Sequence, residues 1–312
     1  MIAPSTDRRT VGGTALGLLA LVFWSTSIAF TRRVAEDFGA LAGMSIAYAA
    51  GGALGCVWLA ASGRLNRALA MPRTYHLVCG GLMAAYGICY SGAIGLARDR
   101  QAVLEVGIIN YLWPGLTMLL SLPILRRRGN PYLFLGIALA FAGAAMAIGQ
   151  SGDFSWQAFG RNLLTVSPAH LLALAGALIW AFYSNFNTRL GSGSDGEAAP
   201  LHLLGMGAGL FLLRCVIGET GAWHPTATGW LFLAATTVFP VLLGYLFWDM
   251  TMRRGHLNIV VPASYATPLL STVLSIPVLG VRPGTGLWLA CGLVIAGAML
   301  CRTTANQRTN NR

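Results

Sequence analysis

Long apolar runs separated by short polar stretches dominate this chain of 312 residues. A membrane-spanning helix needs roughly 20 consecutive, mostly apolar residues. Ten runs have about this length, at residues 13–31, 38–61, 74–96, 102–122, 131–149, 169–188, 199–218, 228–249, 256–279 and 284–301. The pattern therefore predicts an all-α transmembrane fold, a bundle of ten helices.

The connections between these runs are short and carry turn-forming residues such as Gly, Pro and Asn. The longest connection, 150–168, separates five runs at 13–149 from five at 169–301. We expect tails at 1–12 and 302–312, and no stretch is left for a separate soluble domain. The first run follows two arginines but is too long for the core of a signal peptide, so we interpret it as a span.

The two groups of five runs are related in sequence. Residues 120–125 read LSLPIL and residues 274–279 read LSIPVL, an offset of 154. Tyr111 and Pro114 match Tyr265 and Pro268 at the same offset, and Trp24 matches Trp180 at an offset of 156. Because five is odd, the second copy enters the membrane from the opposite side. Inverted repeats of this kind are typical of secondary transporters, whose substrate site lies near the midplane between the copies.

Composition agrees with a membrane protein and excludes several activities. Hydrophobic residues make up 55% of the chain and charged residues only 10%, whereas soluble domains are about 25% charged. The net charge of +11 does not indicate nucleic-acid binding, because the basic residues cluster between apolar runs. All of them are Arg. Without Lys the chain has neither a Schiff-base site for retinal or pyridoxal phosphate nor a Walker A loop. We expect no cofactor.

The arginines also predict the orientation, because cytoplasmic loops are enriched in positive residues. With the N-terminus inside, fourteen arginines lie on the cytoplasmic side and six on the other, and Arg214 lies within a span. We therefore expect both termini in the cytoplasm.

Two prolines within the apolar runs mark a candidate substrate site. A proline inside a helix removes one hydrogen bond and frees the carbonyl four residues earlier. Pro114 would free the carbonyl of Asn110, and Pro268 that of Ser264. Such groups are tolerated at membrane depth where neighbouring groups or a water-lined cavity satisfy them. The repeat thus predicts broken, polar stretches at matching positions in both halves. A kink that only improves packing is the alternative.

Aromatic residues away from the predicted membrane interfaces are the second indication of a cavity. Trp and Tyr usually form interfacial belts, but several here fall near the middle of the runs. Ring faces can stack on an aromatic ligand or contact a cationic group. Core packing is the alternative for each ring taken singly. We expect the cavity to be lined by Trp24, Ser27, Tyr86, Tyr90, Asn110, Tyr111, Trp113, Trp180, Tyr183, Ser264 and Tyr265.

Ionisable residues give little support for a proton relay. Glu105 lies about one turn into its run, where a wetted interface position and a coupling role are both open. The five histidines lie at run ends without the spacing of metal ligands, and the six cysteines lack CxxC spacing. We expect no metal. Passive transport is at least as plausible as proton coupling.

These features resemble a known family. The first run, LVFWSTSIAFTR, and the five-plus-five repeat resemble the EamA-type branch of the drug/metabolite transporter superfamily. The segment Asn110–Pro114, followed by Leu116 and Thr117, resembles the fourth span of bacterial aromatic amino acid exporters in that branch. The resemblance implies a bacterial inner-membrane exporter of aromatic and other neutral amino acids, which works by alternating access through a central cavity between the two repeats.

Other functions stay open at this point. An efflux transporter of organic cations or drugs would need a deep acid, for which Glu105 is the candidate. A membrane-bound enzyme would need a nucleophile or metal cluster, and a scaffold would not need an inverted repeat. We expect amino acids and the lipid bilayer as partners, no nucleic acid, and function as a monomer.

Overall fold

The computed structural model of the protein describes residues 8–126, 131–148, 166–191, 197–219, 223–254, 259–260 and 263–306. Most of the predicted connection at 150–168 lies outside these residues, as do 1–7 and 307–312 of the predicted tails. Residues 8–12 and 302–306, assigned above to the tails, are helical.

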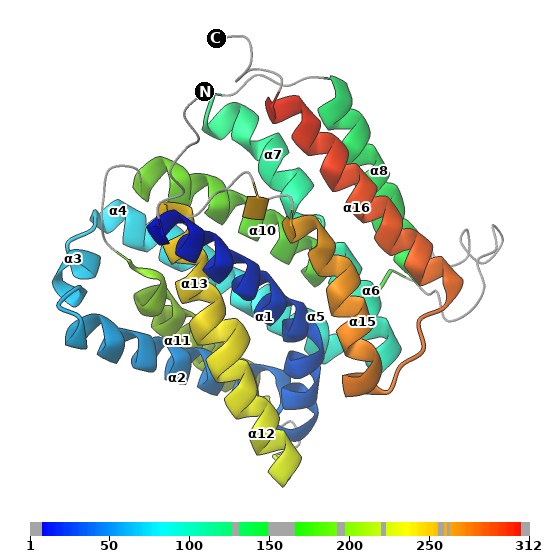
Figure 1. Cartoon of the computed structure of the whole chain (residues 1–312). Helices are drawn as coiled ribbons and strands as arrows, with labels where there is room; N and C mark the ends of the chain where they lie inside the picture. Colours follow the sequence, from blue (N-terminus) through cyan, green and yellow to red (C-terminus); the bar gives the residue numbers. More distant parts are fainter. Residues whose placement is uncertain are drawn as a thin grey trace.

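Every regular element in the described residues is helical. Figure 1 shows one bundle of helices. Its elements are α1 (Arg8–Phe38), α2 (Ala40–Ala61), α3 (Leu65–Leu69), α4 (Arg73–Tyr75), η1 (His76–Gly80), α5 (Gly81–Leu96), α6 (Arg100–Asn110), α7 (Trp113–Ile124), α8 (Pro131–Ala147), α10 (Pro168–Gly191), α11 (Ala199–Ile217), α12 (Ala227–Thr236), η3 (Thr237–Leu243), α13 (Gly244–Arg254), η4 (Ser264–Ala266), α15 (Thr267–Leu279) and α16 (Thr285–Asn306). Of these, η1 and η3 are π-helical and η4 is a 3₁₀ turn.

Seven stretches of helix are long and apolar enough to cross a membrane. They are Val11–Phe38, Ala40–Ala61, Arg73–Leu96, Arg100–Ile124, Pro168–Gly191, Ala199–Ile217 and Ala227–Thr251. Three shorter apolar helices, Pro131–Ala147, Ser264–Leu279 and Thr285–Cys301, lie in the other three predicted runs. The all-helical prediction is confirmed for the described residues, and the count of ten spans stays a prediction.

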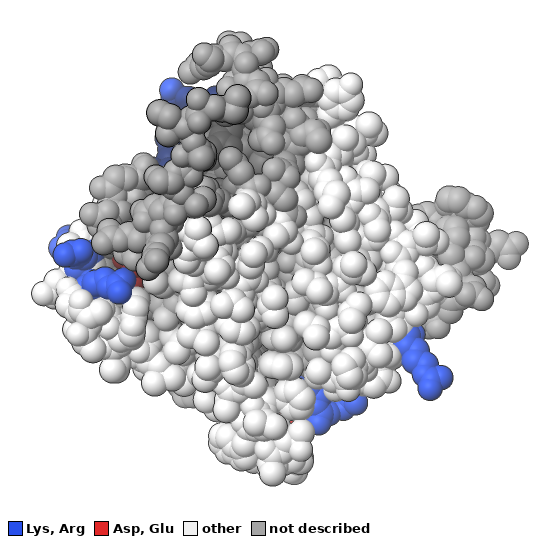
Figure 2. Space-filling view, viewed as in Figure 1, with Lys and Arg blue, Asp and Glu red and all other residues white. Residues whose placement is uncertain are grey.

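The surface agrees with a bilayer as the surrounding solvent. Large apolar side chains such as Leu77, Val216 and Leu231 point outward, which would be unfavourable over a wide area in water. On the face in Figure 2, the coloured charged atoms of the described part lie at the margins, and a broad uncharged area separates them.

The two halves interlock through their first long helices. The helix α1 packs against η3, α13 and α15 of the second half, and α10 packs against α5, α6 and α7 of the first half. In Figure 1, α1 accordingly lies beside α13 and α15. Because each half lends a helix to the other, the residues that face the centre come from both halves.

Ion pairs are concentrated at the two ends of the bundle. At the end where α1 finishes, which we call the Glu36 end, Arg32, Arg33 and Arg100 all bind the Glu36 carboxylate. At the opposite end, the Arg64 end, Arg64 binds the buried Glu197 at 2.8 Å. Charge is thus kept at the ends, where water and lipid headgroups solvate it.

A glycine makes the turn from α1 into α2 possible. Gly39 has φ +84°, a backbone conformation that L-residues with a side chain rarely adopt. The Glu219 carboxylate crosses from the second half and accepts hydrogen bonds from the first free N–H groups of α2, at Leu41 (3.1 Å) and Ala42 (3.0 Å). This negative group at a helix N-terminus stabilises the turn.

The contact between α8 and α16 depends on small residues. A Cβ at Gly297 would lie 2.4 Å from the Gly136 carbonyl oxygen, and one at Gly136 would lie 2.6 Å from that of Gly297. Close backbone approach of this kind holds helices together in lipid, where the hydrophobic effect between helices is absent.

We predict that Gly297→Ala lowers the melting temperature in detergent, because the added methyl meets backbone that cannot move aside. We expect the free energy of unfolding to fall by about 1–3 kcal/mol, the usual cost of overpacking. Gly292→Ala in the same helix is the matched control, because its Cβ would meet open space. Equal melting temperatures for the two variants would contradict this account of the contact.

Candidate functional site

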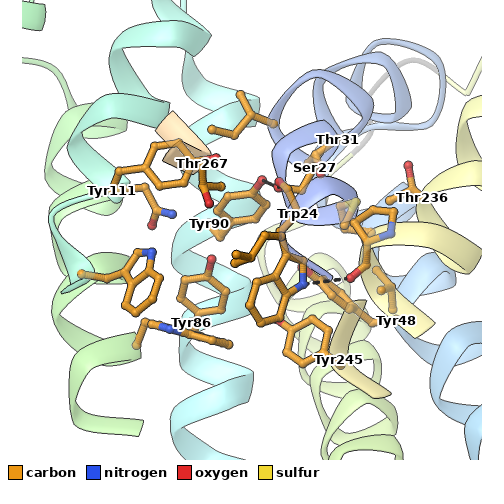
Figure 3. Close-up of a pocket in the computed structure, with 18 residues that line it drawn as sticks. Trp24, Ser27, Thr31, Tyr48, Tyr86, Tyr90, Tyr111, Thr236, Tyr245 and Thr267 are labelled. Carbon is orange, nitrogen blue, oxygen red and sulfur yellow. Dashed lines mark hydrogen bonds between the residues drawn. The ribbon is translucent and has the colours of Figure 1, made fainter. Parts of the chain in front are cut away.

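A cavity lies at the centre of the bundle, between the two halves. Figure 3 shows side chains from both halves that converge on it. Its walls are formed by Leu21, Trp24, Ser27, Ile28, Thr31, Met44, Tyr48, Tyr86, Tyr90, Asn110, Tyr111, Trp113, Trp180, Thr236, Pro240, Val241, Tyr245 and Thr267. The space open to the centre of a water-sized sphere is about 70 Å³, so the site is narrow in this conformation.

Trp180 of α10 is the hub of the aromatic wall. Its ring contacts Trp24 at 6.0 Å, Tyr86 at 4.9 Å and Tyr245 at 5.9 Å between centroids. It also touches Trp113 edge-on at 6.4 Å. Such tilted and T-shaped pairs are the favoured aromatic geometries. The five rings come from α1, α5, α7, α10 and α13, so this cluster joins both halves.

Hydrogen bonds fix the orientation of the α1 face of the cavity. The Tyr90 hydroxyl donates to Ser27 Oγ at 3.1 Å, and Ser27 Oγ donates to the Trp24 carbonyl at 2.6 Å. The indole N–H of Trp24 donates to the Pro240 carbonyl at 3.1 Å. The dashed line in Figure 3 marks this last bond, which links α1 to η3 in the other half.

Two interrupted helices bring backbone and polar side chains to the cavity. The helix α6 ends at Asn110 and α7 begins at Trp113, with Pro114 in its first turn. The 3₁₀ turn Ser264–Ala266 precedes α15, whose second residue is Pro268. A proline in the first helical turn loses nothing, because that N–H would have no partner within the helix.

The lining carries no formal charge at neutral pH. Among the described residues that form it there is no Asp, Glu, Arg or His, and eight are aromatic. Its polar groups are hydroxyls, the Asn110 amide and the Trp indoles. A neutral or zwitterionic ligand with an aromatic body fits such a lining better than an ion, because an unpaired ionic group in an apolar site is costly.

The structure brings together eight of the eleven residues predicted for the cavity: Trp24, Ser27, Tyr86, Tyr90, Asn110, Tyr111, Trp113 and Trp180. The other three lie elsewhere. Tyr183 packs on Trp180 at 5.1 Å and reaches the cluster around Tyr75 and Cys79. Ser264, Tyr265 and Pro268 are buried outside the lining, and the partly buried Pro114 also lies outside it.

Sequence reasoning missed several lining residues, two of which the repeat could have revealed. Tyr245 matches Tyr90 at an offset of 155, and Thr267 matches Trp113 at an offset of 154. Tyr48 on α2, Thr236 at the end of α12 and Pro240 on the unpredicted π-helical η3 gave no such signal.

Glu105 is buried beside a histidine rather than wetted at an interface. Its side chain is 2% exposed, and His170 Nε2 lies 3.1 Å from its Oε2. The Ser167 N–H donates to His170 Nδ1 at 3.1 Å, so Nε2 is the nitrogen that donates to Glu105. Arg98 lies 3.6 Å away. The pair joins α6 to the N-terminus of α10 near the Glu36 end and does not line the cavity.

Across the part of the chain that the structure describes, no group of three or more His, Cys, Asp or Glu side chains could hold a metal ion.

Comparisons with known proteins agree with a transporter. The chain is 28% identical over 288 residues to the aromatic amino acid exporter YddG of Escherichia coli K12, which covers 92% of this chain and 96% of that protein. YddG of Salmonella typhimurium is 27% identical over 95% of this chain and 98% of its own length. YddG of Ancylobacter novellus is 28% identical over 94% and 98%.

A solved crystal structure has the same fold, with a TM-score of 0.68, 26% identity and coverage of 96% of this chain and 99% of the other. The profile of the EamA-like transporter family matches twice, at residues 11–149 and 167–303, one match in each half. With its apolar spans, the chain is a multi-pass protein of the bacterial inner membrane, and it belongs to the EamA-like transporter family.

Proposed function

We propose that this protein exports aromatic and other neutral amino acids through the cavity between its two halves. The observation that supports this most directly is the lining, which combines eight aromatic rings with no formal charge in its described residues. The similarity to three YddG exporters along nearly the whole chain supports the same substrate class.

The cavity offers a partner for each part of such a substrate. The aromatic side chain would stack between rings of the Trp180 cluster. The ammonium group would lie against ring faces and the Asn110 amide oxygen. The carboxylate would accept hydrogen bonds from hydroxyls such as those of Tyr48, Tyr86 and Thr267. A zwitterion brings its own counter-charge, so it needs no buried ion from the protein.

Transport would proceed by alternating access, with ties at one end of the bundle released at a time. Ties between the halves exist at both ends in this conformation. At the Arg64 end, Arg64 pairs with Glu197, and Tyr75 donates to Asn187 at 2.7 Å. At the Glu36 end, Arg100 donates to the Leu279 carbonyl at 3.1 Å. Rocking one half against the other would break the contacts at one end while those at the other end form.

We place both chain termini in the cytoplasm. The arginine tally carries this orientation, and four of the six arginines it puts outside have acidic partners in the structure. Arg32, Arg33 and Arg100 bind Glu36, and Arg98 lies near Asp99 and Glu105. Ten spans, the seven long ones and the three shorter, would return the chain to the side on which it began.

Export of organic cations is the competing function within the same family. It would call for a carboxylate in the cavity, to balance the cationic charge. The deep acid considered for that role, Glu105, is bound to His170 outside the lining. The absence of a carboxylate from the described lining therefore favours neutral amino acids over organic cations as substrates.

Purified protein in liposomes should show saturable uptake of labelled phenylalanine in counterflow. Tryptophan in excess should compete, whereas an organic cation such as tetraphenylphosphonium should not, because the cavity has no charge to pair with it. Protein-free liposomes give the background. Flux that neither saturates nor responds to tryptophan would refute the proposed substrate class.

Replacing a lining ring should impair transport without unfolding the protein. For Trp113→Ala and Tyr111→Ala we expect kcat/KM for phenylalanine to fall about tenfold, since one ring contact with an aromatic or ammonium group is worth about 1–2 kcal/mol. Phe134→Ala, on the exposed face of α8, is the matched control. Wild-type kinetics in both cavity variants, with normal elution on gel filtration, would mean that these rings only fill the core.

The burial of Glu105 outside the cavity leads us to expect transport that does not depend on a proton gradient. Counterflow should run at the same rate with and without an imposed gradient, in wild type and in Glu105→Gln. Glu105→Ala should instead lower the melting temperature, because it leaves the buried His170 N–H without its acceptor, at a cost of about 1–3 kcal/mol. Acceleration by the gradient that disappears in Glu105→Gln would identify Glu105 as the coupling residue.

A further inference from the structure

The cavity wall formed by Trp24 depends on an irregularity in the opposite half. In a regular α-helix the Gly244 N–H would bond to the carbonyl of Pro240, four residues back. Here η3 is π-helical, and the Gly244 N–H bonds to the Phe239 carbonyl, five residues back. The Pro240 carbonyl accepts instead from the indole N–H of Trp24 at 3.1 Å. The π-helical turn thus supplies the acceptor that holds Trp24.

The same turn places Gly244 against the edge of this indole. A Cβ at position 244 would lie 2.7 Å from Trp24 Nε1 and 3.0 Å from its Cδ1. Real Cβ atoms essentially never come closer than 3.0 Å to other atoms. The absence of a side chain at Gly244 is therefore what lets the indole lie flush with α13.

Neighbouring rings limit the directions in which the Trp24 indole can move. Its ring is packed by Trp180 at 6.0 Å, Tyr245 at 5.6 Å and Trp248 at 5.1 Å. In Figure 3 its N–H is directed to the side of Thr236 and Tyr48, and Tyr86 and Tyr90 lie on its other side, across the cavity. A push from position 244 would therefore move the ring toward Tyr86 and Tyr90 and narrow the cavity.

We propose that Gly244, which is outside the cavity lining, determines the largest substrate side chain that the cavity accepts, by setting how far Trp24 retracts. This inference rests on the proposed transport of amino acids. A shift of roughly 0.7 Å would bring the Cβ contact back to an ordinary 3.4 Å. In a site with only about 70 Å³ open to the centre of a water-sized sphere, a shift of this size would obstruct the bulkiest substrate first.

The test compares transport of tryptophan with that of threonine in liposomes. For Gly244→Ala we expect kcat/KM for tryptophan to fall about tenfold while that for threonine changes less than about twofold, which is the scale on which a pocket discriminates by one methyl group. Gly292→Ala, whose Cβ meets open space on α16, should leave the ratio unchanged. Gly244→Ala combined with Trp24→Phe should restore the ratio, because the smaller ring makes room.

Two results would overturn the proposal: an unchanged tryptophan-to-threonine ratio in Gly244→Ala, or a lowered ratio that Trp24→Phe does not restore. If Gly244→Ala does not fold, Trp24→Phe alone decides, because a wider cavity must raise the ratio above wild type. A tryptophan-to-threonine ratio below that of wild type in Trp24→Phe would contradict the proposal. Wild-type protein that transports neither amino acid would refute the proposed function as well, whereas normal wild-type flux with an unaltered ratio refutes the role of Gly244 alone.

Discussion

The hydrogen bond from the Trp24 indole to the Pro240 carbonyl is the interaction on which the rest of the site depends. It joins α1 of the first half to η3 of the second at the centre of the bundle. Lipid supplies no water to replace a lost partner, so each buried polar group must be satisfied within the protein. The π-helical turn frees the carbonyl and the indole satisfies it. The ring held in this way then packs on Trp180 and forms one wall of the cavity.

The pairing of Trp24 with Trp180 follows from the duplication. The two residues occupy matching positions in the repeat, 156 residues apart, on the two helices that cross into the opposite half. Matching residues on exchanged helices meet near the axis that relates the copies. A contact of two large rings there ties the halves together at one point and leaves their ends free to differ. That arrangement is compatible with the proposed rocking of the two halves about a fixed centre.

The sequence predicted the helices and eight of the eighteen residues that line the cavity, because both depend on local patterns. Apolar runs located the helices, and the repeat located the interruptions at Asn110 and Ser264. The features that the sequence did not predict depend on contacts with helices that are distant in the chain. Tyr183 and Tyr265 have the same residue type as Tyr86 and Tyr111, but their helices turn them to other neighbours. Likewise no local pattern showed that Glu105 would meet His170, 65 residues away, or that η3 would be π-helical.

The distribution of charge also reflects the cost of burying ionic groups, and it affects how the protein can open. Glu36, Glu197 and Glu219 each bind cationic or backbone N–H groups near the ends of helices, and the described lining of the cavity holds no ion. An ion in the cavity would lose its hydration whenever the site closed and would need a partner in every conformation. A neutral cavity avoids that cost and leaves ion pairing to the ends, where water can replace a broken tie. Under the proposed alternating access, opening either end would exchange partly buried contacts, such as Arg64 with Glu197 or Arg100 with the Leu279 carbonyl, for contacts with water, and the described lining itself has no ion pair to break.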